Sequence, residues 1–189
     1  MSPAEPTSGL ILAGGAGRRM GGADKGWIHH QGKPLVEHVF ERLALQVDQV
    51  LISANRNLDR YAALGVPVLA DGDTDFRGPL AGIESGLRHA AAGWLLCVPC
   101  DSPALPDDLG RRLHAGLAGG RAAVVTLAGR WQPVFCLLHT SLVDSLSAYL
   151  SRGDRKVASW LESVDARAVD FTDEAPAFAN LNSPELLSP

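Results

Sequence analysis

A glycine-rich stretch with clustered charge, LAGGAGRRMGGADKG, occupies residues 12–26. It holds six glycines, and its charged side chains are Arg18, Arg19, Asp24 and Lys25. Glycine leaves backbone N–H groups open to the oxygens of an anion, while arginine adds paired donors and lysine adds a point charge. Because Arg18 and Arg19 are adjacent, we expect only one of them to face such an anion. The stretch therefore indicates a site for phosphate groups.

The stretch matches neither of two familiar phosphate-binding loops. The pattern G-x-x-x-x-G-K-[ST] fails because Lys25 stands between Asp24 and Gly26, and G-x-G-x-x-G fails because Met20 takes the third glycine position. A plain connector is an alternative, but connections in compact domains are usually about 4–6 residues long. A helical conformation would cost on the order of 5–6 kcal/mol for the six glycines, relative to alanine. We therefore interpret the stretch as a functional loop.

The loop lies within a regular alternation of apolar strands and amphipathic helices. We expect strands near residues 9–15, 49–55, 66–71, 94–101, 122–127, 134–139 and 166–171, and helices near residues 34–46, 58–65, 78–93, after Pro106, after Thr140 as a cap, and near 155–164. Such alternation predicts an α/β fold, in which a mostly parallel central sheet carries helices on both faces in a three-layer, Rossmann-like arrangement. No repeat or linker divides the chain, so we expect residues 1–189 to form a single domain.

Asp101 is a second candidate for chemistry, because it ends the fourth expected strand. Ligands of such sheets bind beyond the carboxyl ends of the strands, where the glycine-rich loop also begins. A carboxylate at this edge could hold Mg²⁺, which prefers oxygen ligands and bridges phosphate oxygens. The alternative is structural, since aspartate also suits the turn formed by DSP at residues 101–103.

Composition and charge argue against several other function classes. The chain has 189 residues and a formal net charge of −4, which disfavours a broad nucleic-acid or membrane-binding surface. No apolar run approaches the roughly 20 residues of a membrane span. The start MSPAEPTSG lacks the basic and apolar regions of a signal peptide, so we expect a cytoplasmic protein, with a monomer as the default.

The cysteines and histidines suggest no metal or hydrolase site. Cys97 and Cys100 have C-x-x-C spacing, but a structural zinc site needs four ligands and a redox pair sits at a helix N-terminus. Cys97 instead falls inside an apolar strand, so we interpret these thiols and Cys136 as packing residues, with redox or metal roles as alternatives. The six histidines have no metal-ligand spacing and are expected at the surface.

Across nearly its whole length the chain resembles the molybdenum cofactor guanylyltransferases (molybdopterin-guanine dinucleotide synthases). Residues 12–26 resemble the family signature LAGG-x-[SG]-x-RMG-x(1–2)-DK, and the segments GKPL, GPLAGI, PCDSP, QPVFCL and NLNSPE follow in order. The resemblance implies a nucleotidyltransferase that transfers GMP from GTP to molybdenum-molybdopterin and releases pyrophosphate, with Mg²⁺ as its cofactor. It also implies a GTP-binding half at about residues 8–105, an acceptor-binding half at about residues 106–189, and possible partners among the proteins of the cofactor pathway.

The resemblance further implies roles for individual residues. The GTP-binding set would be Leu12, Ala13, Gly14, Gly15, Gly22, Lys25, Asn55, Asp71, Gly78, Pro79 and Asp101. Catalysis would depend on Lys25, Arg19 and Asp101, with Asp101 as the metal ligand. Arg19 is favoured over Arg18 because it matches the arginine of the RMG motif. The molybdopterin-binding set would be Asn180, Asn182, Arg155 and Lys156.

Several alternatives stay open at this point. Asn182 could cap the local backbone ahead of Pro184, and Arg155 with Lys156 could be a solvated helix start. Ser53 departs from relatives that carry asparagine there, which puts a direct contact with the base in doubt. The rival functions are a cytidylyltransferase for the same cofactor, another nucleotidyltransferase of this fold, and a GTP-binding protein without catalysis. The segments LAGG and CDSP favour guanine over cytosine, since the cytidylyltransferases carry LAAG and a DQP-like segment.

Overall fold

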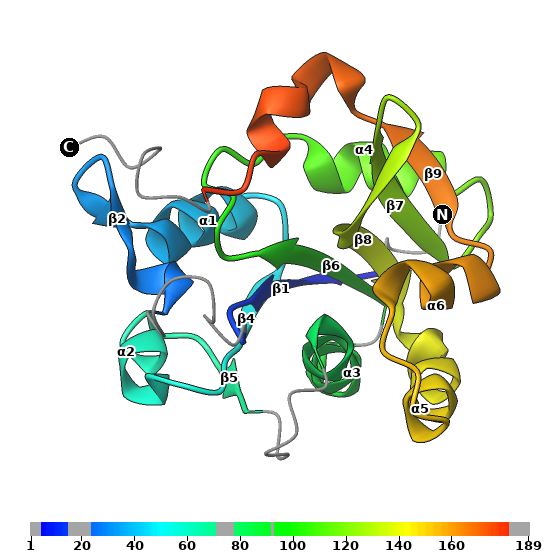
Figure 1. Ribbon diagram of the computed structural model, residues 1–189, viewed down its shortest axis with the longest axis horizontal. Coiled ribbons are helices and arrows are strands. Elements are labelled where there is room, and N and C mark those ends of the chain that lie inside the picture. The colour runs from blue at the N-terminus through cyan, green and yellow to red at the C-terminus, as the bar shows by residue number, and fades with distance from the viewer. Residues whose placement is uncertain (1–4, 15–23, 71–77, 92, 182–189) are drawn as a thin grey trace.

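A seven-stranded sheet forms the central layer of the computed structural model, which describes residues 5–14, 24–70, 78–91 and 93–181 (Figure 1). Its strands lie in the order β5-β4-β1-β6-β8-β7-β9, and β2 and β3 form a separate two-stranded sheet. The strands are β1 (Thr7–Leu12), β2 (His29–His30), β3 (Lys33–Pro34), β4 (Gln49–Ser53), β5 (Val68–Leu69), β6 (Trp94–Pro99), β7 (Ala122–Leu127), β8 (Arg130–His139) and β9 (Arg167–Asp170).

The large sheet is mostly parallel, as the sequence predicts. The pairs β5–β4, β4–β1, β1–β6 and β7–β9 are parallel, whereas β8 is antiparallel to both of its neighbours. β8 also begins at Arg130, four residues before the expected strand at 134–139. A tight turn with positive φ at Ala128 and Gly129 starts this hairpin, and a register shift between Val124 and Val125 interrupts the β7–β8 pairing opposite Pro133. Proline cannot donate to a strand ladder, which is why the sequence pattern hid the first part of β8.

Helices cover both faces of the sheet, so the three-layer prediction is confirmed (Figure 1). Helices α1 and α4 and the 3₁₀ segment η4 pack on one face, and α3, α5 and α6 pack on the other. The helices are η2 (Lys25–Trp27), α1 (Leu35–Ala44), α2 (Leu58–Ala62), α3 (Pro79–His89), α4 (Leu109–Gly116), η3 (Thr140–Leu142), α5 (Val143–Ser151), α6 (Val157–Ser163) and η4 (Thr172–Phe178).

The apolar strands bury side chains on both faces, which is why they read as continuous apolar runs. On β6, Leu96 and Val98 join the cluster under α1 and α4, whereas Leu95 and Cys97 join the cluster under α3, α5 and α6. The buried stripe of α1 contains Leu35, Val36, Val39 and Leu43, the positions that the helical spacing picks out.

The beginning of α5 differs from the expectation. Thr140 does not cap a helix; it begins η3, and its hydroxyl accepts a hydrogen bond from the N–H of Gly93 at 3.3 Å. The side chain of His139 takes the cap position instead, since its Nδ1 accepts from the N–H of Ser141. The segment therefore ties β8 back to the residue that precedes β6.

The three cysteines are free thiols buried in the core, as expected of packing residues. Cys97 on β6 lies directly opposite Cys136 on β8. Burial raises the pKa of the Cys97 thiol well above its ordinary value, and the contact with Cys136 adds to this. Burial likewise raises the pKa of Cys100. Thiolates, which redox and metal chemistry require, are therefore disfavoured at both positions.

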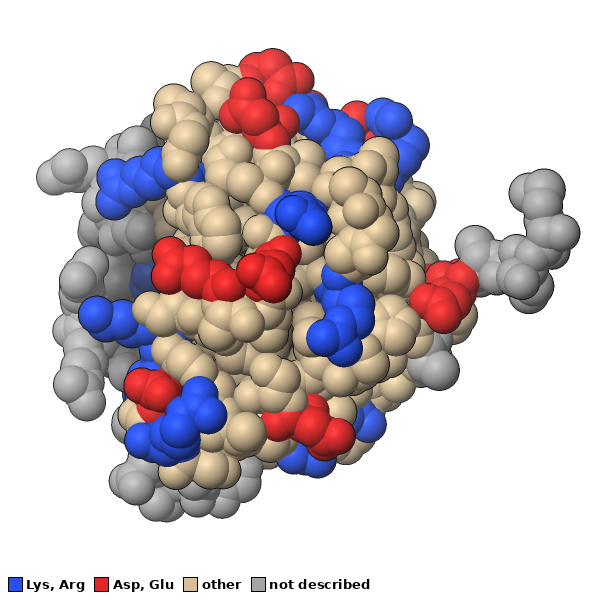
Figure 2. Space-filling view, turned by 90° about the vertical axis from the view of Figure 1, so that its right-hand side faces the viewer, with Lys and Arg blue, Asp and Glu red and all other residues tan. Residues whose placement is uncertain are grey.

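The described helices and surface bear on membrane spanning and on nucleic-acid binding. No helix among residues 5–14, 24–70, 78–91 and 93–181 is long and apolar enough to cross a membrane. On the face shown in Figure 2, acidic and basic side chains are interspersed rather than gathered by sign. That face therefore carries no continuous basic stripe of the kind that tracks a nucleic-acid backbone.

Candidate active site at the carboxyl ends of β1 and β6

The chain reverses its direction of travel across the sheet next to β1. The connection after β1 leads to β4 on one side, and the chain later returns to β6 on the other side. Strands that diverge in this way leave a crevice beyond their carboxyl ends, where open α/β sheets bind their ligands. Lys25 follows β1 and Asp101 follows β6 along the chain, so both side chains are candidates for the chemistry.

Lys25 and Asp101 form an ion pair beyond the carboxyl ends of β1 and β6. The ammonium group of Lys25, on η2, lies 3.2 Å from the Oδ2 atom of Asp101, which follows β6. The Lys25 side chain is 31% exposed and that of Asp101 only 10%. A carboxylate so nearly buried is costly unless a cation or hydrogen bonds compensate it. The ammonium group of Lys25 is therefore partly exposed to solvent, whereas the Asp101 carboxylate is nearly buried and ion-paired.

The end of β1 lies against the end of β4. The N–H of Ala13 donates to the carbonyl of Ser53 at 2.8 Å, and the N–H of Cys100 donates to the carbonyl of Leu12 at 3.1 Å. Gly14 faces the side chain of Asn55, because a Cβ atom at Gly14 would lie 3.5 Å from the amide nitrogen of Asn55. Leu12, Ala13, Gly14 and Asn55, which were predicted to contact GTP, thus lie together where β1 and β4 end, with Ala13 buried. Ser53, the departure from relatives, is also buried.

The start of α3 lies beside these strand ends. Pro79 takes the first position of the helix, and Gly78 precedes it with φ +70°, a conformation that favours glycine. A Cβ atom at Gly82, in the first turn of α3, would meet Leu12 and Ser53, so the helix begins at the edge where β1 and β4 end. The free N–H groups of a helix N-terminus favour anions, and the role of Gly78 and Pro79 in a nucleotide pocket stays a prediction.

The last described residues, Asn180 and Leu181, contact the turn that contains Asp101. The N–H of Leu181 donates to the carbonyl of Asp101 at 3.0 Å, and the hydroxyl of Ser102 donates to the amide oxygen of Asn180 at 2.8 Å. Asn180 is exposed, so its amide NH₂ stays available to a ligand. The structure thereby brings one residue predicted for the acceptor beside the residue predicted for the metal.

Arg155 and Lys156 are engaged at the junction of α5 and α6. The guanidinium of Arg155 donates to the carbonyls of Leu150 and Asp154, and the carbonyl of Lys156 accepts from Trp160 and from the hydroxyl of Tyr149. The contacts of Arg155 fit the alternative of a helix start, whereas those of Lys156 involve only its backbone carbonyl, so the ligand role of its side chain stays a prediction. The other predicted residues, Gly15, Arg18, Arg19, Gly22, Asp71 and Asn182, lie outside the described residues.

Sequence reasoning missed a cluster beside Lys25. Asp24 accepts hydrogen bonds from the side chains of Asn57 and Tyr61, at the start of α2 and within it. The one signal in the sequence is a tyrosine inside the polar segment LDRYA, at a position that a surface helix would bury. No sequence pattern connects that tyrosine with Asp24.

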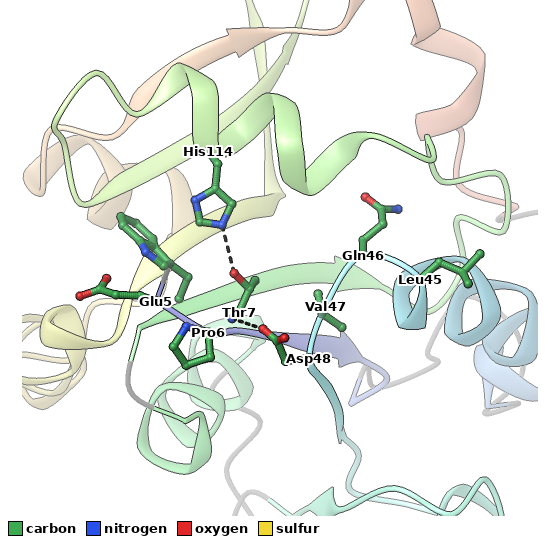
Figure 3. Close-up of a pocket in the computed structure, with 9 residues that line it drawn as sticks. Glu5, Pro6, Thr7, Leu45, Gln46, Val47, Asp48 and His114 are labelled. Carbon is green, nitrogen blue, oxygen red and sulfur yellow. Dashed lines mark hydrogen bonds between the residues drawn. The ribbon is translucent and has the colours of Figure 1, made fainter. Parts of the chain in front are cut away.

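A separate hollow lies at the opposite edge of the sheet, where β1 and β6 begin (Figure 3). It measures about 630 Å³ and is lined by Glu5, Pro6, Thr7, Leu45, Gln46, Val47, Asp48, Trp94 and His114. Its polar groups largely satisfy one another: Thr7 donates its N–H to Asp48 at 2.8 Å and contacts His114 through its hydroxyl at 3.1 Å. None of the predicted site residues lines this hollow, and it is set apart from the Lys25–Asp101 pair.

Comparisons with known proteins find relatives that match nearly the whole chain. The model of the MobA-like NTP transferase domain matches residues 9–168. A protein named molybdenum cofactor guanylyltransferase from Polynucleobacter asymbioticus is 48% identical over 97% of this chain and 94% of its own length. Relatives with the same name from Burkholderia ambifaria and Yersinia pseudotuberculosis are 49% and 47% identical, over 96% and 94% of this chain and 94% and 91% of their own lengths.

Solved structures share the fold at lower identity. Molybdopterin-guanine dinucleotide biosynthesis protein A from Archaeoglobus fulgidus has a TM-score of 0.78 at 24% identity, covering 95% of this chain and 94% of that one. A 4-diphosphocytidyl-2C-methyl-D-erythritol synthase from Anaerococcus prevotii has a TM-score of 0.72 at 11% identity, covering 96% and 92%. These likenesses show the architecture, whereas the substrate has to be argued from the site.

Proposed function

The chain belongs to the molybdenum cofactor guanylyltransferases within the MobA-like NTP transferase domain family, and from this premise we propose that it transfers GMP from GTP to molybdenum-molybdopterin. The observation that carries the proposal is the pairing of Lys25 with Asp101 at 3.2 Å, beyond the carboxyl ends of β1 and β6. These are the two residues that a phosphate-transfer site of this kind needs, one to attract phosphate and one to hold a metal ion.

The reaction joins two anions. The terminal phosphate oxygen of molybdopterin attacks the α-phosphorus of GTP, a new P–O bond forms, and the bond to the β-phosphate breaks to release pyrophosphate. Such a transfer needs alignment and charge compensation more than covalent participation by the protein. Lys25 supplies a positive charge to the triphosphate, and Arg19 is proposed to add a second cation from the glycine-rich loop.

Mg²⁺ is proposed to bind at Asp101. Within the described part of the chain, no group of three or more His, Cys, Asp or Glu side chains could hold a metal by itself. A single buried carboxylate beside a phosphate site fits Mg²⁺, which is commonly held by one or two carboxylates together with substrate phosphates and water. When bound, the ion would supply charge neutralisation to the phosphate oxygens. Asp101 would orient it, and Lys25 would face the same phosphates.

The two substrates are proposed to bind on opposite sides of the Lys25–Asp101 pair. GTP would occupy the N-terminal half at about residues 8–105, where the backbone of Leu12, Ala13 and Gly14 and the amide of Asn55 lie together. Molybdopterin would occupy the half at about residues 106–189. Asn180 supports this side through its contact with Ser102, next to Asp101. Asn182 and Lys156 are assigned to this side by resemblance, whereas the guanidinium of Arg155 is already engaged by the carbonyls of Leu150 and Asp154.

A turnover assay tests the proposal directly. Purified protein is incubated with Mg²⁺, molybdenum-molybdopterin and either GTP or CTP, and pyrophosphate release and the dinucleotide product are measured. We expect product with GTP and little with CTP. Incorporation of CMP alone would mean that the protein is a cytidylyltransferase, and GTP binding without pyrophosphate release would mean that it is a nucleotide sensor.

A further inference from the structure

Asp24, the residue before Lys25, is held by three donors. Its Oδ1 atom accepts from the N–H of Gly26 at 3.2 Å and from the hydroxyl of Tyr61 at 2.7 Å, and its Oδ2 atom accepts from the amide of Asn57 at 2.9 Å. The bond from Gly26 makes Asp24 the cap of η2, the single turn on which Lys25 stands. Fixing this carboxylate therefore fixes the backbone that carries the lysine.

Tyr61 is well suited to hold that carboxylate. The residue is fully buried on α2, and burial, followed by the nearby Cys100 and Asp24, raises the pKa of its hydroxyl. The hydroxyl therefore stays protonated and donates. A hydrogen bond from a buried donor to a carboxylate is stronger than one between neutral groups and has little freedom to rearrange.

The rest of the turn is fitted to the same tyrosine. A Cβ atom at Gly26 would lie 2.5 Å from the Tyr61 hydroxyl oxygen, so a larger residue at position 26 would force the two segments apart. Trp27 packs on the ring of Tyr61 with 5.1 Å between centroids, and the guanidinium of Arg60 lies 4.1 Å from the Trp27 ring. Residues on both sides of Lys25 thus rest on α2.

The hydrogen bonds to Asp24 also matter because this carboxylate lies next to Lys25 in the sequence. A carboxylate adjacent to Lys25 has an obvious alternative partner in the ammonium group, and it would repel the phosphates of both substrates. Tyr61 and Asn57 occupy both of its oxygens on the side of α2. Asn57 does so from a left-handed backbone conformation at φ 50°, which asparagine tolerates better than most residues. The ammonium group of Lys25 is left directed at Asp101.

We propose that Tyr61 and Asn57 are positioning residues of the transfer reaction: they hold Asp24 in the cap of η2 and so keep Lys25 aimed at Asp101 and the phosphates. This inference rests on the proposed function, in which Lys25 acts on the triphosphate. Neither residue is required to touch a substrate, because each acts through Asp24 on the neighbouring lysine.

The test removes one hydroxyl. Tyr61→Phe keeps the ring and its packing on Trp27, and we expect it to lower kcat about tenfold while changing the KM for GTP little, as loss of one charge-assisted hydrogen bond would predict. Thr126→Val is the matched control, because Thr126 is also buried and donates its hydroxyl to the carbonyl of Val169, on β9. It should lose comparable stability and keep its kcat.

A double-mutant experiment distinguishes a positioning role from a general destabilisation of the fold. In a Lys25→Ala enzyme, adding Tyr61→Phe should cause no further loss of kcat, because the lysine through which it acts is gone. Asn57→Gly, which keeps the left-handed backbone but removes the amide, should lower kcat in the same direction as Tyr61→Phe. Equal effects of Tyr61→Phe and Thr126→Val, or full additivity with Lys25→Ala, would overturn the inference.

A chemical readout makes the test independent of turnover. The chain has three lysines, and Lys25 and Lys33 have similarly exposed side chains, at 31% and 36%. Reductive methylation with ¹³C-formaldehyde, followed by NMR, measures the reactivity of each amine. Tyr61→Phe should speed methylation of Lys25 relative to Lys33, and Thr126→Val should not. An unchanged Lys25 rate would refute the positioning role, whereas absence of GMP transfer by the unmodified protein would instead refute the proposed function.

Discussion

The ammonium group of Lys25 lies 3.2 Å from the carboxylate of Asp101, and 76 positions of sequence separate the two residues. Each comes from a loop at the carboxyl end of a strand, and β1 and β6 are hydrogen-bonded neighbours. The ion pair therefore follows from the topology, because the parallel pairing of β1 and β6 brings Lys25 and Asp101 to the same edge of the sheet.

Removing either partner should damage turnover much more than stability. We expect Lys25→Ala and Asp101→Asn to lower kcat by on the order of 10²–10³, the range found when one preorganised charge-stabilising group is lost. Because the Lys25 position is partly exposed, water can solvate Asp101 in its absence, so the loss of folding stability should be much smaller than the loss of turnover. Steady-state kinetics and thermal unfolding of the same preparations measure the two effects.

Arg88→Ala supplies the control for that experiment, since Arg88 forms a partly exposed ion pair with Glu84 at 2.8 Å within α3. Its kcat should stay near that of the unmodified protein. If Lys25→Ala unfolded the protein to the same extent as it lost activity, the pair would be structural rather than catalytic.

Asn180 should affect the acceptor and not GTP. Its amide oxygen is used by Ser102, so the free NH₂ is the group available to molybdopterin. We expect Asn180→Ala to raise the KM for molybdopterin about tenfold, as the loss of a hydrogen bond to a charged group predicts, with the KM for GTP unchanged. Asn182→Ala, by resemblance, should behave in the same way.

Ser102→Ala distinguishes orientation from direct contact. It removes the hydroxyl that holds Asn180 but leaves the amide itself, so we expect a smaller increase in the same KM. Equal increases in the KM for both substrates after Asn180→Ala would contradict its assignment to the acceptor side.

The fold was largely predictable from the sequence because its strands and helices have strong, regular patterns. The stripe Leu35, Val39, Leu43 predicts α1, and the apolar run at 94–99 predicts a strand buried on both faces. The start of β8 was hidden by Pro133, which the register shift at Val124 accommodates. Local pattern cannot reveal such an accommodation, because it depends on the neighbouring strand.

The site was predictable where it depends on strand ends and not where it depends on side-chain pairing. Lys25 and Asp101 follow apolar strands, so their shared edge follows from the topology. The bond between Tyr61 and Asp24 spans 37 positions and starts from a helix of only five residues. The contact of Asn180 with Ser102 likewise depends on how the last segment folds back. Neither pairing has a periodic signature.

The buried thiols should matter for stability and not for nucleotide binding. Cys97→Ser places a hydroxyl in an apolar, fully buried position, which should cost about 1–3 kcal/mol if the hydroxyl lacks a good partner. The affinity for GTP, measured by calorimetry, should be unchanged, and turnover should not depend on added reductant. Loss of GTP binding in a folded Cys97→Ser or Cys136→Ser protein would instead support a functional role for these thiols.

His114 should make the protein less stable at mildly acidic pH. Its ring is half-buried between the hydroxyl of Thr7, at 3.1 Å, and Trp94, at 5.2 Å between centroids, and burial lowers its pKa below the ordinary value of 6.5. The nearby charged groups are Asp48, which holds the N–H of Thr7, and the His139–Glu5 pair on the far side of Trp94. The lowered pKa of His114 comes from burial, which disfavours the protonated ring.

The sign of the effect follows from the direction of that shift. Between the folded-state pKa and 6.5, the unfolded chain binds a proton that the folded protein does not, so stability rises with pH in this window and is complete above it. His114→Gln should flatten the loss of stability between about pH 7 and the lower pKa, while His89→Gln, at an exposed position on α3, should leave it unchanged. Denaturant midpoints measured at intervals across this range test the prediction. An unaltered slope in His114→Gln would assign the acid sensitivity to another group.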